Sequence, residues 1–114
     1  MSWNSQIHHR PGQVYIVWQP WSRLVKIGLS RSFAKYRKSQ LEADYGKLIT
    51  FALVNTDDMK TLEDAMHSKF RRAKFRRERW KTGYSEWFQV NPIELLSMIF
   101  QLHLLALLAR KKWK

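Results

Sequence analysis

The sequence contains no cysteine, few acidic residues, no internal repeat and no low-complexity linker. Without cysteine the chain cannot form disulfides, thiolate metal sites or a cysteine nucleophile, and this composition fits a reducing compartment. Nine acidic residues stand against 21 lysines and arginines, which gives a net charge of +12 at pH 7. So much positive charge on 114 residues indicates a polyanionic partner. Nucleic acid is the first candidate for that partner, and an anionic membrane surface is the second.

The length and the apolar content fit one compact domain. Apolar residues make up 45% of the chain and aromatic residues 14%, which is enough for a packed core, and 114 residues leave no room for a second core. The first residues are polar and lack the features of a secretory signal, so we expect a cytoplasmic or nucleoid-associated protein. We expect residues 1–12 to be a polar N-terminal segment, residues 13–90 the folded domain, and residues 91–114 a C-terminal apolar helix with a basic end.

The strands are predicted from runs of β-branched and aromatic residues. Residues 13–18 and 24–28 form such runs, and Pro20 helps to fix the turn between them. Residues 48–54 have the composition of a third strand, and residues 86–90 form a shorter extended segment.

Three helices are predicted around these strands. The first begins at Ser30 or Ser32, either of which could cap it, and ends before Gly46. The second is capped within residues 55–58, and the third opens where Asn91 precedes a proline. Apolar residues in the second helix recur at intervals of three and four, at Met59, Leu62, Met66 and Phe70. The expected fold is α/β of the α+β kind, a three-stranded antiparallel sheet flanked by helices in the order β-β-α-β-α-(β)-α.

One arginine falls on an apolar face of the first predicted helix. Phe33, Arg37 and Leu41 are four residues apart, so they share a face, and the two apolar residues should be buried. An arginine keeps its charge inside a protein, so Arg37 needs a carboxylate, a phosphate or a route to water. Either its stem covers the edge of the core, or its guanidinium points at a phosphate.

Glu63 and His67 lie one turn apart beside the apolar stripe of the second helix. A carboxylate and an imidazole at this spacing can form a metal and proton-transfer pair, because Mg²⁺ accepts one carboxylate and keeps several waters. The alternative is a solvated surface pair with Lys60 or Lys69 nearby.

Two tripeptides, Gln13-Val14-Tyr15 and Lys26-Ile27-Gly28, are separated by ten residues, and alone they would fit any β-hairpin. Three further elements follow them in the sequence: Arg37 nine residues past Gly28, then Leu62-Glu63-Asp64-Ala65-Met66-His67, then Glu86-Trp87-Phe88. In order and spacing these elements resemble the GIY-YIG nuclease superfamily, in the branch whose second tripeptide is K-I-G. The resemblance covers residues 13–90.

The resemblance implies a metal-dependent endonuclease that hydrolyses phosphodiester bonds of nucleic acid, with DNA as the favoured substrate. It implies that Tyr15 is the general base, assisted by Lys26 or His67. Arg37 would stabilise charge on the phosphoryl oxygens, and Glu63 would hold a single Mg²⁺ or Mn²⁺. The alternative is a nucleic-acid-binding module that keeps the fold but does not cut.

The sequence departs from the superfamily pattern at two positions. Gln13 replaces a glycine, and we expect little effect on the backbone. Lys26 replaces a tyrosine: its ammonium could favour the phenolate form of Tyr15, neutralise a phosphate, or lie on the solvent side of the hairpin. The residues expected to have structural roles are Gly28, Glu86 and Trp87, and Glu86 could also complete the metal shell.

A basic segment follows the second helix, with eight basic residues and one acidic residue between positions 69 and 81. Most of the eight are arginines, which form bidentate pairs with phosphate. Phe70 should belong to the core, while Phe75 and Trp80 either stack on bases or anchor the segment. The residues expected to contact nucleic acid are Arg31, Lys35, Lys38, Arg71, Arg72, Lys74, Arg76, Arg77, Arg79 and Lys81.

The last predicted helix, residues 92–109, is apolar on most of its surface and is followed by a basic end. Its length is near the lower limit for a membrane span, but Glu94, Gln101 and His103 oppose insertion into lipid. We therefore expect burial over the sheet or self-association in a homodimer, rather than a membrane span.

Overall fold

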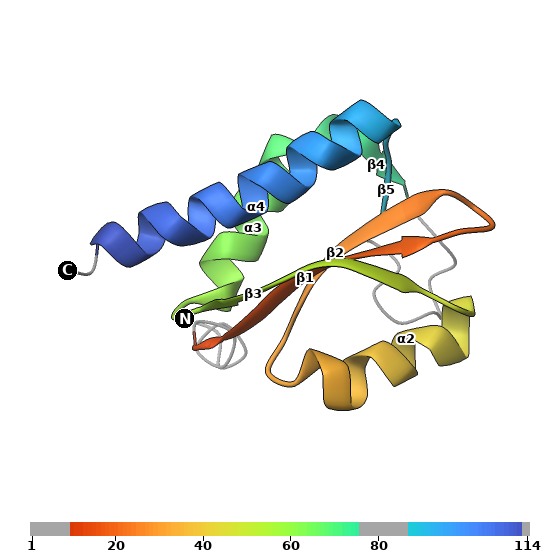
Figure 1. Cartoon of the computed structure of the whole chain (residues 1–114), viewed down its shortest axis with the longest axis horizontal. Coiled ribbons are helices and arrows are strands. Elements are labelled where there is room, and N and C mark those ends of the chain that lie inside the picture. Colours follow the sequence, from red (N-terminus) through yellow and green to blue (C-terminus); the bar gives the residue numbers. More distant parts are fainter. Residues whose placement is uncertain (1–9, 76–86, 113–114) are drawn as a thin grey trace, which may run out of the picture.

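The computed structural model describes residues 10–75 and 87–112, which form an antiparallel sheet with helices on both faces (Figure 1). In chain order the elements are β1 (Gly12–Gln19), β2 (Leu24–Ser30), the π-helix η1 (Phe33–Arg37), α2 (Lys38–Tyr45), β3 (Ile49–Thr56), α3 (Met59–Lys69), the 3-10 helix η2 (Arg71–Ala73), β4 (Lys74–Phe75), β5 (Trp87–Gln89) and α4 (Pro92–Lys112). The predicted α+β class is confirmed, and the predicted elements occur in the expected order.

The sheet is wider than the predicted three strands. Its five described strands have the order β3-β1-β2-β5-β4, and every neighbouring pair is antiparallel. β5 lies in the extended segment predicted at residues 86–90, and it pairs with the start of β2, residues 24–26. β4 has no counterpart in the prediction, because two residues are too few to show a period.

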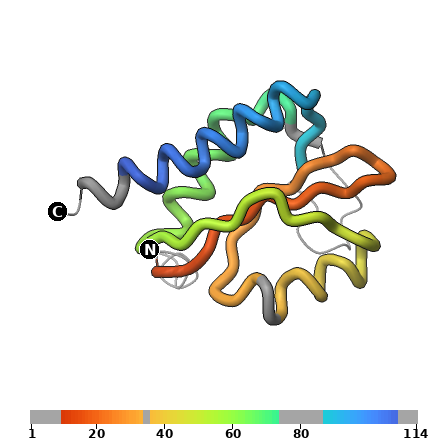
Figure 2. The backbone as a smooth tube through the Cα atoms, in the orientation of Figure 1, coloured from red at the N-terminus to blue at the C-terminus, as the bar shows by residue number. Residues whose placement is uncertain are grey.

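Different helices cover the two faces of the sheet (Figures 1 and 2). α3 and α4 lie side by side over one face, and α2 lies over the other. Side chains alternate along a strand, so β1 and β2 contribute to both cores. The α3–α4 core takes Val14, Ile16, Val25 and Ile27 from these strands. The α2 core takes Tyr15, Val17 and Leu24.

The predicted caps of the second and third helices are present. At the start of α3, the Asp58 carboxylate accepts hydrogen bonds from the Thr61 amide (3.1 Å) and hydroxyl (2.8 Å). At the start of α4, the Asn91 side chain accepts from the Glu94 amide, while the Glu94 carboxylate accepts from the Asn91 amide. This reciprocal capping box fixes the point at which α4 leaves the sheet.

The first helix differs from the prediction at its start. It begins at Phe33 with the five-residue π-helix η1, and the Ser32 side chain makes no capping hydrogen bond. The Gln13 side chain on β1 accepts from the Phe33 amide instead, at 3.0 Å. The other end agrees with the prediction, because Gly46 has a φ of 78°, which favours glycine.

The C-terminal helix α4 packs on the sheet and on α3 along one side only. Met98 and Leu102 are fully buried on that side, within the α3–α4 core. The opposite side carries large apolar residues that are exposed to solvent. Among the residues that the structure describes, no helix combines the length and apolar character required to span a membrane.

Candidate active site

Tyr15 is placed by β1 on the face of the sheet that α2 covers. Its side chain is fully buried, and its ring stacks on Phe33 of η1 with centroids 4.2 Å apart. Stacking on one side and strand geometry at the backbone leave the ring little freedom. The phenolic oxygen therefore has a defined position between β2 and η1.

Two cationic side chains donate hydrogen bonds to that oxygen. Lys26 Nζ lies 3.1 Å from Tyr15 Oη, and Arg37 Nε lies 3.3 Å from the same atom. Lys26 is fully buried, and its ammonium is also 5.1 Å from the centre of the Tyr15 ring. A position on the solvent side of the hairpin is therefore wrong for Lys26. Two cationic donors on one oxygen stabilise negative charge on it.

Gly28 makes room for this arrangement. It is the cross-strand partner of Tyr15, and an added Cβ would lie 2.4 Å from Tyr15 Oη and 2.6 Å from Lys26 Nζ. Heavy atoms at such distances overlap, so any other residue at position 28 would displace the phenol, the ammonium or both. The glycine is required here for space rather than for its backbone conformation.

Arg37 reaches Tyr15 from the end of η1. The expected burial of its neighbours on that face is confirmed, because Phe33 and Leu41 are buried while Arg37 is partly exposed. Short π-helical segments are frequently found at functional sites. The Nε contact uses one of the five N–H donors of the guanidinium, so the group can bind Tyr15 and a further acceptor.

Gln13 connects the two elements that carry Tyr15 and Arg37. Its Oε1 accepts from the Phe33 amide at 3.0 Å, and its Nε2 donates to Asn55 Oδ1 on β3 at 3.2 Å. From the sequence, Gln13 was expected to matter only as the replacement of a glycine. The available signal was alternation, since Gln13 and Tyr15 are two residues apart on one strand and share a face.

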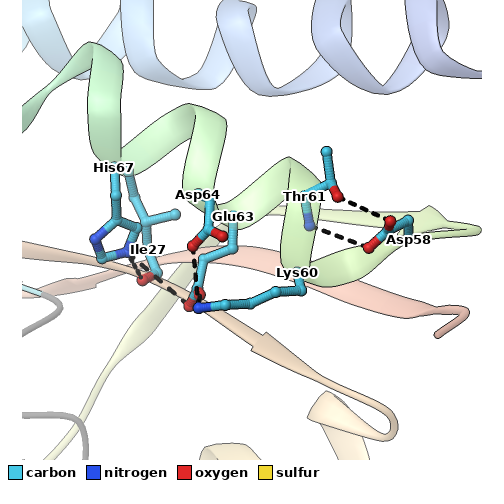
Figure 3. Close-up of polar contacts among 7 residues, drawn as sticks. All are labelled: Ile27, Asp58, Lys60, Thr61, Glu63, Asp64 and His67. Carbon is cyan, nitrogen blue, oxygen red and sulfur yellow. Dashed lines mark hydrogen bonds and ion pairs between the residues drawn. The ribbon is translucent and has the colours of Figure 1, made fainter. Parts of the chain in front are cut away.

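Glu63 and His67 extend from α3 toward β2 (Figure 3). Glu63 is only 4% exposed, so the alternative of a solvated surface pair is wrong for it. His67 Nε2 lies 2.9 Å from the Ile27 carbonyl oxygen and 4.0 Å from Glu63 Oε2. A carbonyl oxygen only accepts hydrogen bonds, so Nε2 carries the proton that faces it.

Lys60 lies beside the same carboxylate, one turn earlier on α3 (Figure 3). Its ammonium is 3.6 Å from Glu63 Oε1 and 3.0 Å from Asp64 Oδ1. Partial burial acts to lower the pKa of Lys60, but the hydrogen bond to Asp64 and the charges of Glu63 and Asp64 outweigh it, so the pKa is raised above 10.5. The Glu63 carboxylate thus already stabilises a neighbouring cation.

The group around Tyr15 and the group on α3, Glu63 and His67, contact β2 at neighbouring residues. Lys26 and Gly28 contact Tyr15 on the α2 face, and the carbonyl of Ile27 between them receives His67 from α3. Within the described residues β5 pairs with β2 only as far as Lys26. The Ile27 carbonyl therefore lies just beyond that pairing, where α3 can reach it.

Among the described residues, no group of three or more histidine, aspartate or glutamate side chains is arranged to hold a metal ion. The metal prediction therefore concerns Glu63. Its buried carboxylate next to an ammonium has the charge and the hard oxygen donors that Mg²⁺ or Mn²⁺ requires.

The residues expected to contact nucleic acid are only partly within the described range. Arg31, Arg71 and Arg72 are exposed, and Lys38 is partly exposed. Lys35 lies in η1 and Lys74 in β4. Outside the described residues are Arg76, Arg77, Arg79, Lys81 and Glu86.

Trp87, expected to be structural, is fully buried in the α2 core, and Phe70 packs against the α3–α4 core.

The fold and the contacts define a small α+β domain in which a buried phenol, an ammonium and a guanidinium meet on one face of a sheet. The chain belongs to the T5orf172 domain family, whose model matches residues 12–103. The match begins at β1 and ends within α4, so it includes both groups of side chains. No curated protein and no solved structure matches the chain.

Proposed function

We propose that this chain is a metal-dependent endonuclease of the GIY-YIG type, which hydrolyses phosphodiester bonds of nucleic acid, DNA above all. The observation that carries the proposal is the contact of both Lys26 and Arg37 with the oxygen of Tyr15. Membership of the T5orf172 domain family supports a nucleic-acid-related function, and the net charge of +12 suits a polyanionic substrate.

In this proposal Tyr15 takes the proton from the attacking water. The base would be the phenolate of Tyr15, which becomes a neutral phenol on taking the proton. Lys26, fully buried beside it, would stabilise the charge of the phenolate before the transfer. Arg37 binds a phosphoryl oxygen through N–H groups other than Nε, and so stabilises the charge that develops in the transition state. Because Tyr15 is fully buried, the side chains that cover it would have to move before water could reach the phenol.

Glu63 would hold one Mg²⁺ or Mn²⁺, and the bound ion would supply Lewis-acid stabilisation of the leaving oxygen. His67 would limit the movement of the Glu63 carboxylate, because its ring lies 4.0 Å from Glu63 Oε2 and is held by the hydrogen bond from Nε2 to the Ile27 carbonyl. Lys60 would move from Glu63 to Asp64, which it already contacts at the shorter distance of 3.0 Å.

Substrate binding would use the basic residues around this site. If six of them contacted phosphates, the logarithm of the affinity would fall with that of the salt concentration at a slope of about −5 on duplex DNA. Exposed Arg31, Arg71 and Arg72 are candidates within the described residues.

Nicking of supercoiled plasmid tests the proposal. The purified chain should convert plasmid to the open-circular form in Mg²⁺ or Mn²⁺. Glu63→Gln and Arg37→Ala should each lower the rate by roughly 10²–10³-fold, as removal of a transition-state stabiliser does. Matched controls are Asp57→Asn, an exposed acid just before α3, and Arg23→Ala in the β1–β2 turn.

Both controls should cut like wild type, and all variants should keep the wild-type circular dichroism spectrum. Absence of cutting in every metal, or unchanged cutting by Glu63→Gln and Arg37→Ala, would contradict the enzymatic proposal.

A nucleic-acid-binding module on the same fold is the second candidate. Complete burial of Tyr15 and Lys26 favours it, because a buried hydroxyl and ammonium can also satisfy each other structurally. Salt-dependent binding of a labelled oligonucleotide without cutting in any metal would support this function.

A further inference from the structure

We infer that a second copy of this chain covers the outer side of α4, so that two α4 helices pack antiparallel about a twofold axis near Phe100. The side in question is opposite Met98 and Leu102, which face the core. This pairing concerns a part of the molecule remote from Tyr15, and it does not depend on the proposed chemistry.

The outer side of α4 is an apolar stripe made of Ile93, Leu96, Phe100 and Leu107. These side chains are 79%, 68%, 62% and 51% exposed, although each is large and apolar. Their spacings of three, four and seven residues place them on one face of the helix, and repeat the interval at which paired helices make contact. A helix that presents core residues on two opposite sides normally has neighbours on both.

The exposed area of the outer stripe agrees with what a dimer requires. With roughly 200 Å² available on each large apolar residue, the stripe and the adjacent half-exposed Leu108 offer on the order of 600 Å² per copy. A stable interface buries roughly 800 Å² per partner, and the polar rim beside the stripe would supply the remainder. That rim includes the exposed residues Ser97 and His103.

Charge selects the antiparallel orientation. The first turn of α4 carries Glu94, and its end carries the basic residues 110–112. An antiparallel pair places the acidic start of one helix near the basic end of the other, and it also opposes the two helix dipoles. A parallel pair would bring the two basic ends together, in a chain with a net charge of +12.

The twofold axis then follows from the spacing of the stripe. Phe100 is midway between Ile93 and Leu107, so in an antiparallel pair it meets its own counterpart while Ile93 meets Leu107. The two Tyr15 sites would lie on outward faces, because α2 and α4 cover opposite sides of the sheet (Figure 1). The pairing of α4 would therefore not cover the Tyr15 side of either copy.

Sedimentation equilibrium of the wild-type chain and two variants tests the pairing. Wild type should be a dimer at micromolar concentration, and Phe100→Glu should raise the dissociation constant at least about tenfold, as loss of a central interface residue does. Trp21→Glu is the matched control and should leave the dimer intact, because Trp21 is 70% exposed and donates to the Tyr45 carbonyl at the end of α2, on the face opposite α4. A monomeric wild type, or equal dissociation constants for wild type and Phe100→Glu, would overturn the inference.

Disulfide trapping tests the orientation of the two helices. Because the chain has no cysteine of its own, only introduced cysteines can form a cross-link. Phe100→Cys alone should cross-link on oxidation, and so should the double variant Ile93→Cys with Leu107→Cys. Ile93→Cys alone should stay uncross-linked, whereas efficient linkage of that single variant would indicate a parallel pair and overturn the antiparallel arrangement. A monomer that floats with anionic liposomes through α4 would show a lipid occupant instead of a second copy, and would overturn the inference.

Discussion

The two faces of the sheet are made by the same strands, yet they differ in what they bury. Toward α3 and α4, the fully buried side chains of β1 and β2 are aliphatic, and Trp18 packs partly buried beside them. Toward α2 they present Tyr15, Lys26 and Gln19, and the polar atoms of all three are buried. Apolar contacts are non-directional, whereas each buried polar atom requires a partner at a defined distance and angle. The α3–α4 face can therefore serve stability, while the α2 face fixes a geometry.

The sharpest test of this difference is Tyr15→Phe. The cleavage rate should fall roughly 10²–10⁴-fold, the contribution expected of a general base, while the ring still stacks on Phe33. Plasmid nicking measures the rate, and urea unfolding measures the stability. The control is Tyr36→Phe, because Tyr36 is 59% exposed on η1 and should cut normally. A Tyr15→Phe protein that cuts like wild type would remove the functional distinction between the faces.

On the face toward α3 and α4, a substitution in the core should lower the stability and leave the cleavage rate unchanged. Leu102→Ala removes a fully buried side chain from the α3–α4 core, so the free energy of unfolding should fall by about 2–5 kcal/mol. Urea unfolding measures this loss. Cleavage per folded molecule should stay unchanged at a temperature where the variant is folded, and a large drop there would show that the two faces are not independent.

Gln13→Ala tests how the α2 face holds its geometry. The Phe33 amide would lose its acceptor, so stability should fall by about 0.5–2 kcal/mol, as it does for a lost helix cap. Since η1 also carries Arg37, the turnover number should fall more than the Michaelis constant changes. Asn55→Ala removes the other partner of Gln13 and should leave the turnover number at the wild-type value. Gln13→Glu keeps an acceptor for the Phe33 amide, so its turnover number should be higher than that of Gln13→Ala. Equal turnover in all three variants would assign Gln13 a purely structural role.

Lys60→Gln should have the smallest effect on stability and an informative effect on metal. The exposed pair of Lys60 with Asp64 should contribute only about 0.2–1 kcal/mol, and the ammonium is farther, at 3.6 Å, from the buried Glu63, so the melting temperature should fall modestly. Mn²⁺ should bind more tightly, because the carboxylate of Glu63 loses a competing cation. Electron paramagnetic resonance without nucleic acid measures this binding, and Lys69→Gln on the same helix is the control. Unchanged or weaker Mn²⁺ binding in Lys60→Gln would contradict the placement of the ion at Glu63.

The pH dependence of the Lys60 contribution has a definite sign. Its pKa is raised in the folded state, so its stabilisation is fully present below the unfolded value of about 10.5. It is lost as the pH rises through the folded pKa. The difference in melting temperature between wild type and Lys60→Gln should therefore shrink above that pH.

Local sequence patterns predicted much of the fold, but they could not predict contacts between residues far apart in the chain. The runs of β-branched and aromatic residues at 13–18 and 24–28 predicted both strands, while the acids before Met59 and the Asn91–Pro92 pair located the starts of α3 and α4. The capping of η1 could not be found this way, because Gln13 is 20 residues away from the amide that it binds. The pairing of β5 with β2 likewise joins residues about sixty positions apart, and no local period reports it.

For the site, the sequence predicted which residues belong to it but not which of them are in contact. The face shared by Phe33, Arg37 and Leu41 was predictable from helical spacing, but the contact of Arg37 with Tyr15 depends on how η1 meets β1. The alternatives for Lys26 were separated only by its burial. Lys60 was expected near Glu63, but its position between Glu63 and Asp64 required side-chain geometry.

The space left by Gly28 links two sequence positions that would otherwise vary separately. A Cβ there would overlap both the hydroxyl and the ring of Tyr15, so a side chain at position 28 would either displace the Tyr15 ring or require a smaller residue at position 15. Among descendants of this chain, a replaced glycine should therefore accompany a replaced tyrosine. Comparing positions 15 and 28 among relatives would separate lineages that keep both the tyrosine and the glycine from lineages in which both are replaced.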